Sequence, residues 1–476
     1  MSLISTNPSV RARFSQGGGI HRIVPAAVAG PRTQAERSQV LDRARQRGMS
    51  ITMRGAGSAM SGSSVGEGLV IDMSRYEAVR DSGIMPGLRL VQSSPATSLG
   101  WIAERAVGHG LRLGPDPSSA AWATVGGTIG TNAAGPRSFR WGAMDRWVAD
   151  IHLETADGYL RLSRVASDQP TDDPFWQRWH DHALPVLERH RDAVMARWPK
   201  TRKNTAGYAL DRFYTSGQLI DLVTGSEGTL GLITSACLFL QPIPSHRASI
   251  RAALGSRRDL AVAVAALAPH LPSSIEFLDR TLLRIMESGV SSATAAGEWR
   301  RTDALILSDF EADDPAVLRD RVAAAQEALR GIADMIEIAH EPAAIDALWQ
   351  VRHRASSALA AIGGGRRSLQ VIEDGCVPPE RLGDYLDAVS AACEAVGLEV
   401  AMFGHAGDGH AHVNLLPDLA NPGWLEQVSQ VFDAVQTAVI DLGGTTAGEH
   451  GAGRLRAGGL ERLLGPEAIE CFAAIK

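Results

Sequence analysis

The chain has 476 residues, of which 45% are hydrophobic and 21% are charged, and this balance excludes a disordered protein. A single hydrophobic core rarely serves so many residues, so two or three domains are expected. Apolar stretches such as residues 230–240 contain Thr and Ser and fall short of the ~18 residues of a membrane-spanning helix. The net charge of −6 argues against a nucleic-acid-binding protein.

The termini and cysteines bear on the compartment. Residues 1–15 lack the apolar segment of a secretory signal. The 4 cysteines are widely spaced and form no CxxC pair, which argues against a disulfide framework, a zinc ribbon and an intrinsic iron–sulfur cluster. We therefore expect a cytoplasmic protein, either free or peripheral at the inner face of the membrane.

The first half of the chain alternates β-branched runs with glycine-rich turns. A helical pattern at residues 32–48 leads into a short strand at 50–53, a glycine loop at 54–66 and a strand at 68–72. A second group of turn residues, 114–142, precedes a strand at 147–154. The region of frequent glycine-rich turns ends near residues 242–244, which predicts a domain boundary there.

The second half alternates strands and helices. The strands are expected at residues 249–254, 304–310 and 335–338, and the helices at 259–267, 315–331 and around 348–361. This alternation predicts an α+β substrate domain.

The glycine loop at residues 54–62 follows a strand. A GxGxxG dinucleotide fingerprint would need Gly at position 60, which holds Met60, and the loop leads to another strand rather than a helix. Backbone N–H groups of such a loop can converge on phosphate oxygens, with Ser58 and Ser61 as further donors. Taken alone, the loop is equally consistent with a surface turn.

Two further glycine-rich segments favour ligand binding over a surface turn. In residues 114–135, Pro115 and Pro117 fix the chain direction, and the glycines that follow remove side chains along one edge. Residues 225–231 form a third such segment. Three separate glycine segments in one domain favour one large, elongated ligand.

Residues 404–414 contain the histidines His405, His410 and His412. A strand at 399–403, a turn at 407–409 and an alternating run at 410–416 predict a hairpin, in which His405 and His412 approach one another. A continuous helix would hold them ~10 Å apart, too far for one ion. With Glu449 they would give two imidazoles and a carboxylate around a metal. The alternative for each histidine is a hydrogen bond with a purely structural role.

These segments together resemble the FAD-linked oxidase family, with a flavin domain of the vanillyl-alcohol-oxidase type, and within it the D-lactate, glycolate and D-2-hydroxyglutarate dehydrogenase branch. The matching segments, in the family's order, are residues 31–33, 54–62, 115–142, 203–208, 225–231, 348–352, 373–374, 404–412 and 448–453. The resemblance implies an α+β protein with a two-subdomain FAD-binding domain at 20–244, a substrate (cap) domain at 245–402 and a C-terminal helical segment at 403–476 that carries the active-site loops.

The resemblance also assigns the cofactor residues. The loop at 54–62 would wrap the FAD pyrophosphate, residues 115–135 would line the ribityl chain and isoalloxazine, and residues 225–231 would complete the cleft. Because residues 54–66 contain no His or Cys, we expect a non-covalent flavin. The FAD-binding residues expected are Arg54, Gly55, Ala56, Gly57, Ser58, Ala59, Ser61, Gly62, Pro115, Asp116, Ser119, Thr124, Gly126, Gly127, Gly130, Asn132, Ala134, Ser138, Gly142, Glu227, Gly228, Gly231 and Ile233.

For the chemistry, the resemblance implies His405, His412 and Glu449 as ligands of Zn²⁺ or Mn²⁺ and His450 as the base. Many relatives have Asn where this chain has His410, which leaves His410 open as an alternative ligand or as a hydrogen-bond donor behind the ligands. Arg352 is expected to bind the substrate carboxylate, with Ser356 and Asn204 also in the active site. A solvated helix arginine is the alternative for Arg352.

The expected reaction is oxidation of a D-2-hydroxy acid such as D-lactate, glycolate or D-2-hydroxyglutarate to the 2-keto acid. Relatives that bind a second carboxylate often have a lysine before residues 377–378, where this chain has only Arg366 and Arg367. The alternatives are a non-catalytic flavin-binding subunit of an oxidase complex and an ether-lipid synthase-type transferase. The expected partners are an electron acceptor (a quinone, an electron-transfer flavoprotein, a cytochrome or an iron–sulfur protein) and a second copy in a homodimer.

Overall fold

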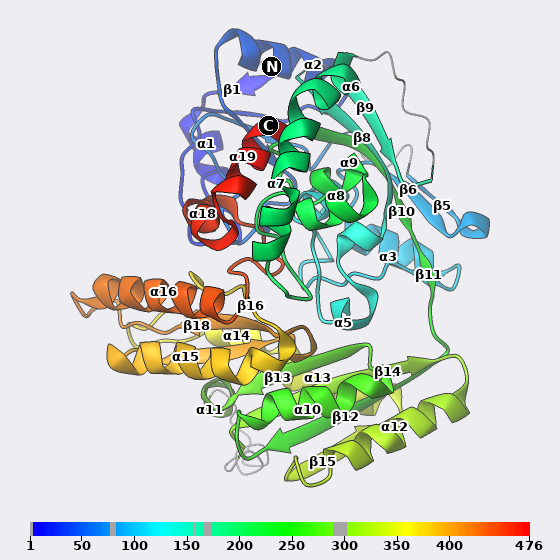
Figure 1. Ribbon diagram of the computed structural model, residues 1–476, viewed down its shortest axis with the longest axis vertical. Helices are drawn as coiled ribbons and strands as arrows, with labels where there is room; N and C mark the ends of the chain where they lie inside the picture. The colour runs from blue at the N-terminus through cyan, green and yellow to red at the C-terminus, as the bar shows by residue number, and fades with distance from the viewer. Residues whose placement is uncertain (1–2, 77–81, 157, 166–173, 289–301) are drawn as a thin grey trace.

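The structure, a computed structural model, describes residues 3–76, 82–156, 158–165, 174–288 and 302–476 (Figure 1). The first domain begins with a small sheet of order β1-β2-β4-β3. Its strands are β1 (Ile4–Ser5), β2 (Ala27–Ala29), β3 (Ile51–Arg54) and β4 (Leu69–Asp72). The Thr33 side chain accepts a hydrogen bond from Glu36 N and caps α2 (Gln34–Gln46), which buries Val40 and Ala44. Because β1 pairs with β2, this sheet includes residues before the expected start at 20.

The second sheet of this domain has five antiparallel strands in the order β5-β6-β10-β8-β9. They are β5 (Gly83–Met85), β6 (Leu90–Ser93), β8 (Val148–Thr155), β9 (Gly158–Ser163) and β10 (Leu232–Phe239). One large core joins the sheet to α3 (Leu99–Val107), α7 (Leu184–Arg197), α8 (Leu210–Ser216) and α9 (Leu219–Val223). The strands expected at 50–53, 68–72 and 147–154 are thus confirmed.

The second domain is built on a seven-stranded antiparallel sheet of order β15-β12-β14-β13-β17-β18-β16. Its strands are β12 (His246–Leu254), β13 (Ser274–Asp279), β14 (Ala304–Ala312), β15 (Met335–Ala339), β16 (Gly375–Cys376), β17 (Val400–Gly404) and β18 (His410–Leu415). The limit expected between residues 402 and 403 falls inside β17, so the histidine hairpin continues the sheet of the substrate domain.

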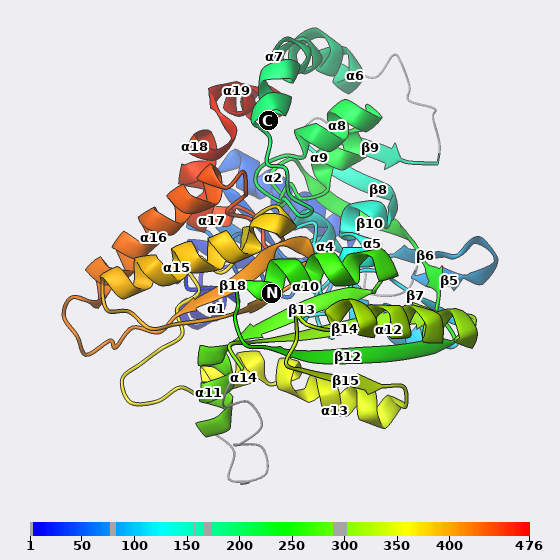
Figure 2. The same cartoon turned by 60° about the horizontal axis from the view of Figure 1, so that its bottom comes forward.

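Helices cover both faces of this sheet (Figure 2). One face packs against α10 (Asp259–Leu267), α12 (Pro315–Leu329), α15 (Leu382–Ala395) and α16 (Trp424–Asp441). The other packs against α11 (Arg280–Ser288), α13 (Pro342–His353) and α14 (Ala355–Ala360). The single helix expected around 348–361 is divided at Arg354, where α13 ends and α14 begins.

The C-terminal helices return to the first domain. The short helix α17 (Gly453–Arg456) leads to α18 (Leu460–Leu464) and α19 (Pro466–Ile475), which lie beside α7 (Figure 1). Leu463 and Cys471 join the core of the first domain, and the Phe472 ring meets Tyr208 edge-on at 5.2 Å. The chain therefore crosses between the domains twice, and the segment just before α17 lies where they meet.

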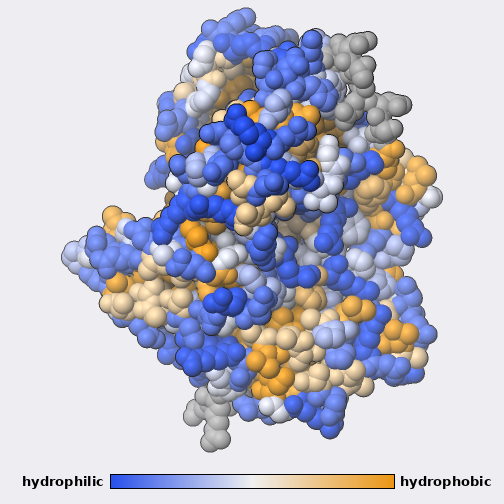
Figure 3. Space-filling model, in the orientation of Figure 1, coloured by the Kyte–Doolittle hydropathy of each residue, from blue (hydrophilic) through white to orange (hydrophobic). Residues whose placement is uncertain are grey.

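Apolar side chains on the surface are scattered. On the face in Figure 3, hydrophilic and apolar residues alternate in small patches over both domains. Within the described residues, none of the helices combines the length and the apolar character that crossing a bilayer requires.

Candidate active site

A cavity of about 960 Å³ lies between the two domains. Its first-domain wall consists mainly of the three glycine-rich segments, and its second-domain wall comes from α13, α14 and the histidine hairpin. Glu227 N donates to Gly130 O at 2.7 Å, and a Cβ added at Gly55 would lie 2.2 Å from Thr124 Oγ1. The three segments are therefore packed against each other, and backbone can approach a flat ligand closely along this wall.

Most of the residues expected to bind FAD line this cavity, so the wall fits the cofactor in size and in its exposed backbone. They are Arg54, Gly55, Ala56, Gly57, Ser58, Ala59, Asp116, Ser119, Thr124, Gly126, Gly127, Gly130, Ala134, Glu227, Gly228, Gly231 and Ile233.

The wall does not include the other expected FAD residues, which are Ser61, Gly62, Pro115, Asn132, Ser138 and Gly142. Several of them support the loops from behind. Asn132 Oδ1 accepts from Asp145 N at 2.8 Å, and Ser138 Oγ donates to Asp408 Oδ2 at 2.7 Å. Ser61 Oγ donates to the carbonyl oxygen of His450 at 2.9 Å, which ties the first glycine loop to the loop of the expected base.

The expected hairpin forms from β17 and β18, with Phe403 opposite His412. Gly409 makes the turn possible, because its φ is +69° and a Cβ there would lie 2.1 Å from Val377 O. The Nε2 atoms of His405 and His412 come within 3.4 Å of one another. Both imidazoles are buried.

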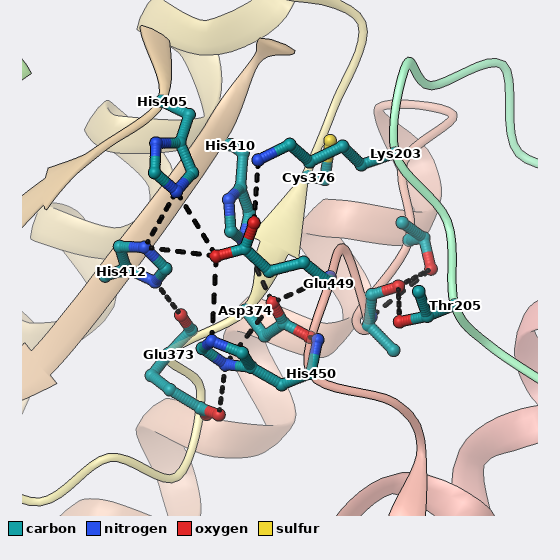
Figure 4. A network of polar contacts seen from close by, with 12 residues as sticks. Lys203, Thr205, Glu373, Asp374, Cys376, His405, His410, His412, Glu449 and His450 are labelled. Carbon is teal, nitrogen blue, oxygen red and sulfur yellow. Dashed lines mark hydrogen bonds and ion pairs between the residues drawn. The ribbon is translucent and has the colours of Figure 1, made fainter. Parts of the chain in front are cut away.

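Glu449 reaches the same point from the loop between α16 and α17 (Figure 4). Its Oε1 lies 3.2 Å from His405 Nε2 and 3.6 Å from His412 Nε2. Two imidazole nitrogens and a carboxylate oxygen so close together are the donors that Zn²⁺ and Mn²⁺ take. The three expected ligands therefore fit a divalent cation.

The other ring nitrogen of each histidine faces an oxygen outside this group. His405 Nδ1 lies 2.6 Å from Glu276 Oε1, and His412 Nδ1 lies 3.0 Å from Glu373 O. Donation of the Nδ1 protons to these oxygens leaves both Nε2 lone pairs free for a cation, the usual arrangement behind metal-binding histidines.

Lys203 supplies a buried positive charge beside the group. Its Nζ lies 2.7 Å from Glu449 Oε2 and 3.4 Å from Asp408 Oδ2. Burial opposes ionisation of Glu449, but the charges of Lys203 and His405 outweigh it and hold the pKa of Glu449 well below its ordinary value. Glu449 is therefore an ionised oxygen donor at neutral pH.

His450 follows Glu449 in the same loop and lines the cavity. Its Nδ1 lies 3.2 Å from Glu373 Oε1, its Nε2 lies 3.6 Å from Glu449 Oε1, and its backbone N donates to Asp374 Oδ2 at 3.0 Å. Burial opposes the charged ring, but Asp374 and Glu373 outweigh it and raise the pKa of His450 to about 9. The His450 ring is thus held in place with Nε2 towards the expected cation.

Arg352 and Ser356 also line the cavity. Arg352 Nε donates to Glu276 Oε2 at 2.9 Å, and the guanidinium lies 4.7 Å from the centre of the Phe403 ring. Arg352 is therefore anchored in the wall, which contradicts the solvated alternative.

Asn204 is placed differently from the other expected catalytic residues. It does not line the cavity, and its Oδ1 accepts from Ala206 N and from Thr445 Oγ1. Its neighbour Lys203 reaches the site instead, with Nζ 2.7 Å from Glu449 Oε2.

Several buried charged residues of the site had no role predicted from the sequence, namely Lys203, Glu276, Glu373, Asp374 and Arg456. A charged residue within the apolar run of β13 was the available signal for Glu276. Residues 203–208 and 373–374 were noted as matching segments, without roles for their charged members. No sequence pattern indicated a role for Arg456, because its partner Glu373 is far away in the sequence. In the folded protein Arg456 Nη2 lies 2.5 Å from Glu373 Oε2.

Comparison with known proteins identifies both domains of the chain. The family described as FAD binding domain matches residues 25–163, and that described as FAD linked oxidases, C-terminal domain, matches residues 243–476. Among solved structures, p-cresol methylhydroxylase with substrate bound has a TM-score of 0.71 at 12% identity, covering 100% of this chain and 91% of that one. An alkyldihydroxyacetonephosphate synthase has a TM-score of 0.65 at 14% identity, covering 98% and 82%. These likenesses show the fold, which is of the vanillyl-alcohol-oxidase type.

Curated relatives match along nearly the whole chain. Identity is 29% to D-lactate dehydrogenase of Archaeoglobus fulgidus, covering 94% of this chain and 87% of that protein. It is 27% to the glycolate oxidase subunit GlcD of Bacillus subtilis, covering 96% and 87%. D-2-hydroxyglutarate dehydrogenase of Pseudomonas putida is 27% identical over 94% of this chain, which spans only 47% of that protein, about half its length. The two matched domains, in this order and on this fold, show that the chain belongs to the FAD-linked oxidase family.

Proposed function

We propose that this protein oxidises a D-2-hydroxy acid to the corresponding 2-keto acid. The proposal rests on one observation: His405, His412, Glu449 and His450 line the same cavity as the three glycine segments, and Arg352 lines it too. A flavin on the glycine wall and an acid bound at Arg352 would therefore share one cavity. Relatives named as D-lactate and D-2-hydroxyglutarate dehydrogenases support the choice of substrate class.

Two groups would complete the site. Bound FAD would accept the hydride from C2 of the acid at flavin N5. A divalent cation held by His405, His412 and Glu449 would lower the pKa of the substrate hydroxyl.

The side chains of the chain have separate roles in this reaction. Arg352, held by Glu276, would bind the substrate carboxylate through its remaining N–H groups, with the Ser356 hydroxyl as a further donor. His450 Nε2 would accept the hydroxyl proton. Without a cation, the pKa of about 9 keeps the His450 ring protonated at neutral pH. A positive charge beside Glu449 would lower this pKa, so that the neutral ring could act as a base.

The cavity favours an acid with one carboxylate. Among the described residues that line it, the only Lys or Arg side chains are Arg54, in the first glycine loop, and Arg352. Arg366 pairs with Glu399 at 2.5 Å, Arg367 donates to backbone carbonyls, and neither lines the cavity. A second carboxylate would lack a fixed cation near Arg352, so we propose a lactate- or glycolate-type substrate.

Chelation tests this function. FAD-loaded protein should stay yellow after its metal is removed, because the glycine wall is separate from the histidine group, but D-lactate or glycolate should then no longer bleach the flavin under anaerobic conditions. Zn²⁺ or Mn²⁺ should restore bleaching. Full bleaching of metal-free protein would contradict the metal-assisted reaction.

A further inference from the structure

We infer that His410 is a third imidazole ligand of the divalent cation, so that His405, His410, His412 and Glu449 hold the ion together. This inference rests on the proposed function, because it concerns the cation of the same site.

The position of the His410 ring carries the inference. One ligand atom can be chosen from each of His405, His410, His412 and Glu449 such that all four lie within 4.8 Å of one another. The centre of the His410 ring lies 5.3 Å from that of His405 and 4.7 Å from that of His412. Figure 4 shows the three imidazoles grouped about the Glu449 carboxylate.

The hydrogen bonds of His410 leave one nitrogen without a partner. Its Nε2 lies 3.0 Å from Asp374 Oδ1, a carboxylate that also accepts from Glu449 N and His450 N. The Nε2 proton therefore points to Asp374, and Nδ1 carries a lone pair. The His410 side chain is 0% exposed, and Nδ1 has no hydrogen-bond partner among the described residues.

A polar atom that is buried without a hydrogen-bond partner destabilises the folded protein. A purely structural role for His410 would need only the bond to Asp374, and the amide of an asparagine could donate that bond at lower cost. A cation bound to Nδ1 removes the penalty and gives His410 the same pattern as His405 and His412: one nitrogen donates to an oxygen, and the other binds the ion.

The backbone beside His410 leaves room for an imidazole ring, which is larger than the side chain of an asparagine. A Cβ added at Gly448 would lie 2.8 Å from His410 Cδ2 and 3.0 Å from Nε2. Glycine at position 448 thus allows the loop that carries Glu449 to pass directly against this imidazole. The His410 ring and the backbone of Gly448 are therefore in close contact beside the expected metal ligands.

A third imidazole also narrows the class of ion. Imidazole-rich sites select transition-metal ions such as Zn²⁺ over Mg²⁺ and Ca²⁺, which prefer oxygen ligands. Four protein ligands would fill a tetrahedral shell, so an ion that also contacts the substrate must accept a fifth ligand, as Zn²⁺ does in some catalytic sites.

Zinc K-edge X-ray absorption of the FAD-loaded protein with one equivalent of Zn²⁺ tests this directly. We expect the scattering of three imidazoles in the wild type and of two in His410→Asn, which keeps a donor for Asp374. In a competition with a chelator, His410→Asn should bind Zn²⁺ at least ~10-fold more weakly. His246→Asn, at an exposed histidine at the start of β12, is the matched control and should change neither result.

The outcomes separate this inference from the proposed function. Two imidazoles in the wild type, or unchanged Zn²⁺ affinity in a folded, flavin-loaded His410→Asn, would overturn the role of His410 and leave the cation of the proposed function in place. A wild type that retains no Zn²⁺ would overturn both. The wild-type spectrum counts the ligands even if the variant fails to fold.

Discussion

Glu276 Oε1 lies 2.6 Å from His405 Nδ1, and both side chains are buried. Glu276 also accepts from Arg352 Nε through its other oxygen, at 2.9 Å. One carboxylate on β13 therefore orients an expected metal ligand and the expected substrate-binding arginine together. Burial opposes its ionisation, but His405 and Arg352 outweigh it and lower the pKa of Glu276.

Glu276→Gln should weaken both kinds of binding. A neutral amide is a poorer acceptor for His405 and Arg352, so Zn²⁺ affinity should fall ~10- to 100-fold and the KM for the hydroxy acid should rise. Metal competition and steady-state kinetics measure the two effects. Glu337→Gln, which removes a carboxylate from an ion pair with Arg251 in the same sheet, is the control. A Glu276→Gln protein with normal metal affinity would show that Glu276 does not orient the ligand.

Arg352→Lys should raise the KM for D-lactate, because an ammonium cannot form the paired hydrogen bonds that a guanidinium makes with a carboxylate. The expected change is ~10- to 100-fold, with FAD content unchanged.

In the wild type, kcat/KM for D-lactate should exceed that for D-2-hydroxyglutarate, since no second Lys or Arg lies near Arg352 among the described cavity residues. The reverse order would contradict a monocarboxylate substrate.

Gly451→Ala should damage the contact between the FAD wall and the catalytic loop. Gly451 has a φ of +82°, and a Cβ there would lie 2.6 Å from Glu227 Cδ. Gly443 has a φ of +73° with open space around it, so Gly443→Ala carries the conformational cost of ~1–2 kcal/mol without the collision. Gly451→Ala should lose a further ~1–3 kcal/mol and retain less FAD, as measured by thermal unfolding and flavin absorbance. Equal losses in the two variants would refute the collision.

The two domains are joined by an ion pair whose strength depends on pH. Arg112, in β7 (Leu111–Arg112), binds Glu311 of β14 through two bonds of 2.6 and 2.7 Å. Burial raises the pKa of Glu311, but Arg112 outweighs it and lowers the value from 4.5 to about 2. A lowered carboxyl pKa stabilises the folded state fully above pH 4.5, and this stabilisation is lost as pH falls towards 2.

Glu311→Gln should therefore reduce the free energy of unfolding by ~1–3 kcal/mol at pH 7. The difference from the wild type should stay constant down to about pH 5 and shrink below it. Denaturant unfolding of both proteins at several pH values measures the difference. A gap that widens on acidification would mean that the ion pair does not produce it.

The hairpin of His405 and His412 followed from the sequence because glycines and a period of two specify it locally. The glycine segments could likewise be assigned to one ligand before their packing was known. Glu276 and Lys203 could not be assigned in this way, because their partners lie far away in sequence and are set by the crossing of the two domains. Asn204 lies outside the cavity whereas Lys203 reaches Glu449, and no sequence pattern predicts which side chain of an irregular segment faces a site. Where the first domain begins and how β17 joins the larger sheet depend on long-range strand pairing, which local patterns do not encode.

Anaerobic mixing of FAD-loaded, metal-replete protein with D-lactate or glycolate tests the central claim most directly. We predict bleaching of the flavin by at least one of these acids, and a rate ~10²- to 10⁴-fold lower in His450→Ala at equal FAD content. A flavin that no 2-hydroxy acid reduces would contradict the proposed function, and bleaching at the wild-type rate in His450→Ala would contradict the role of His450.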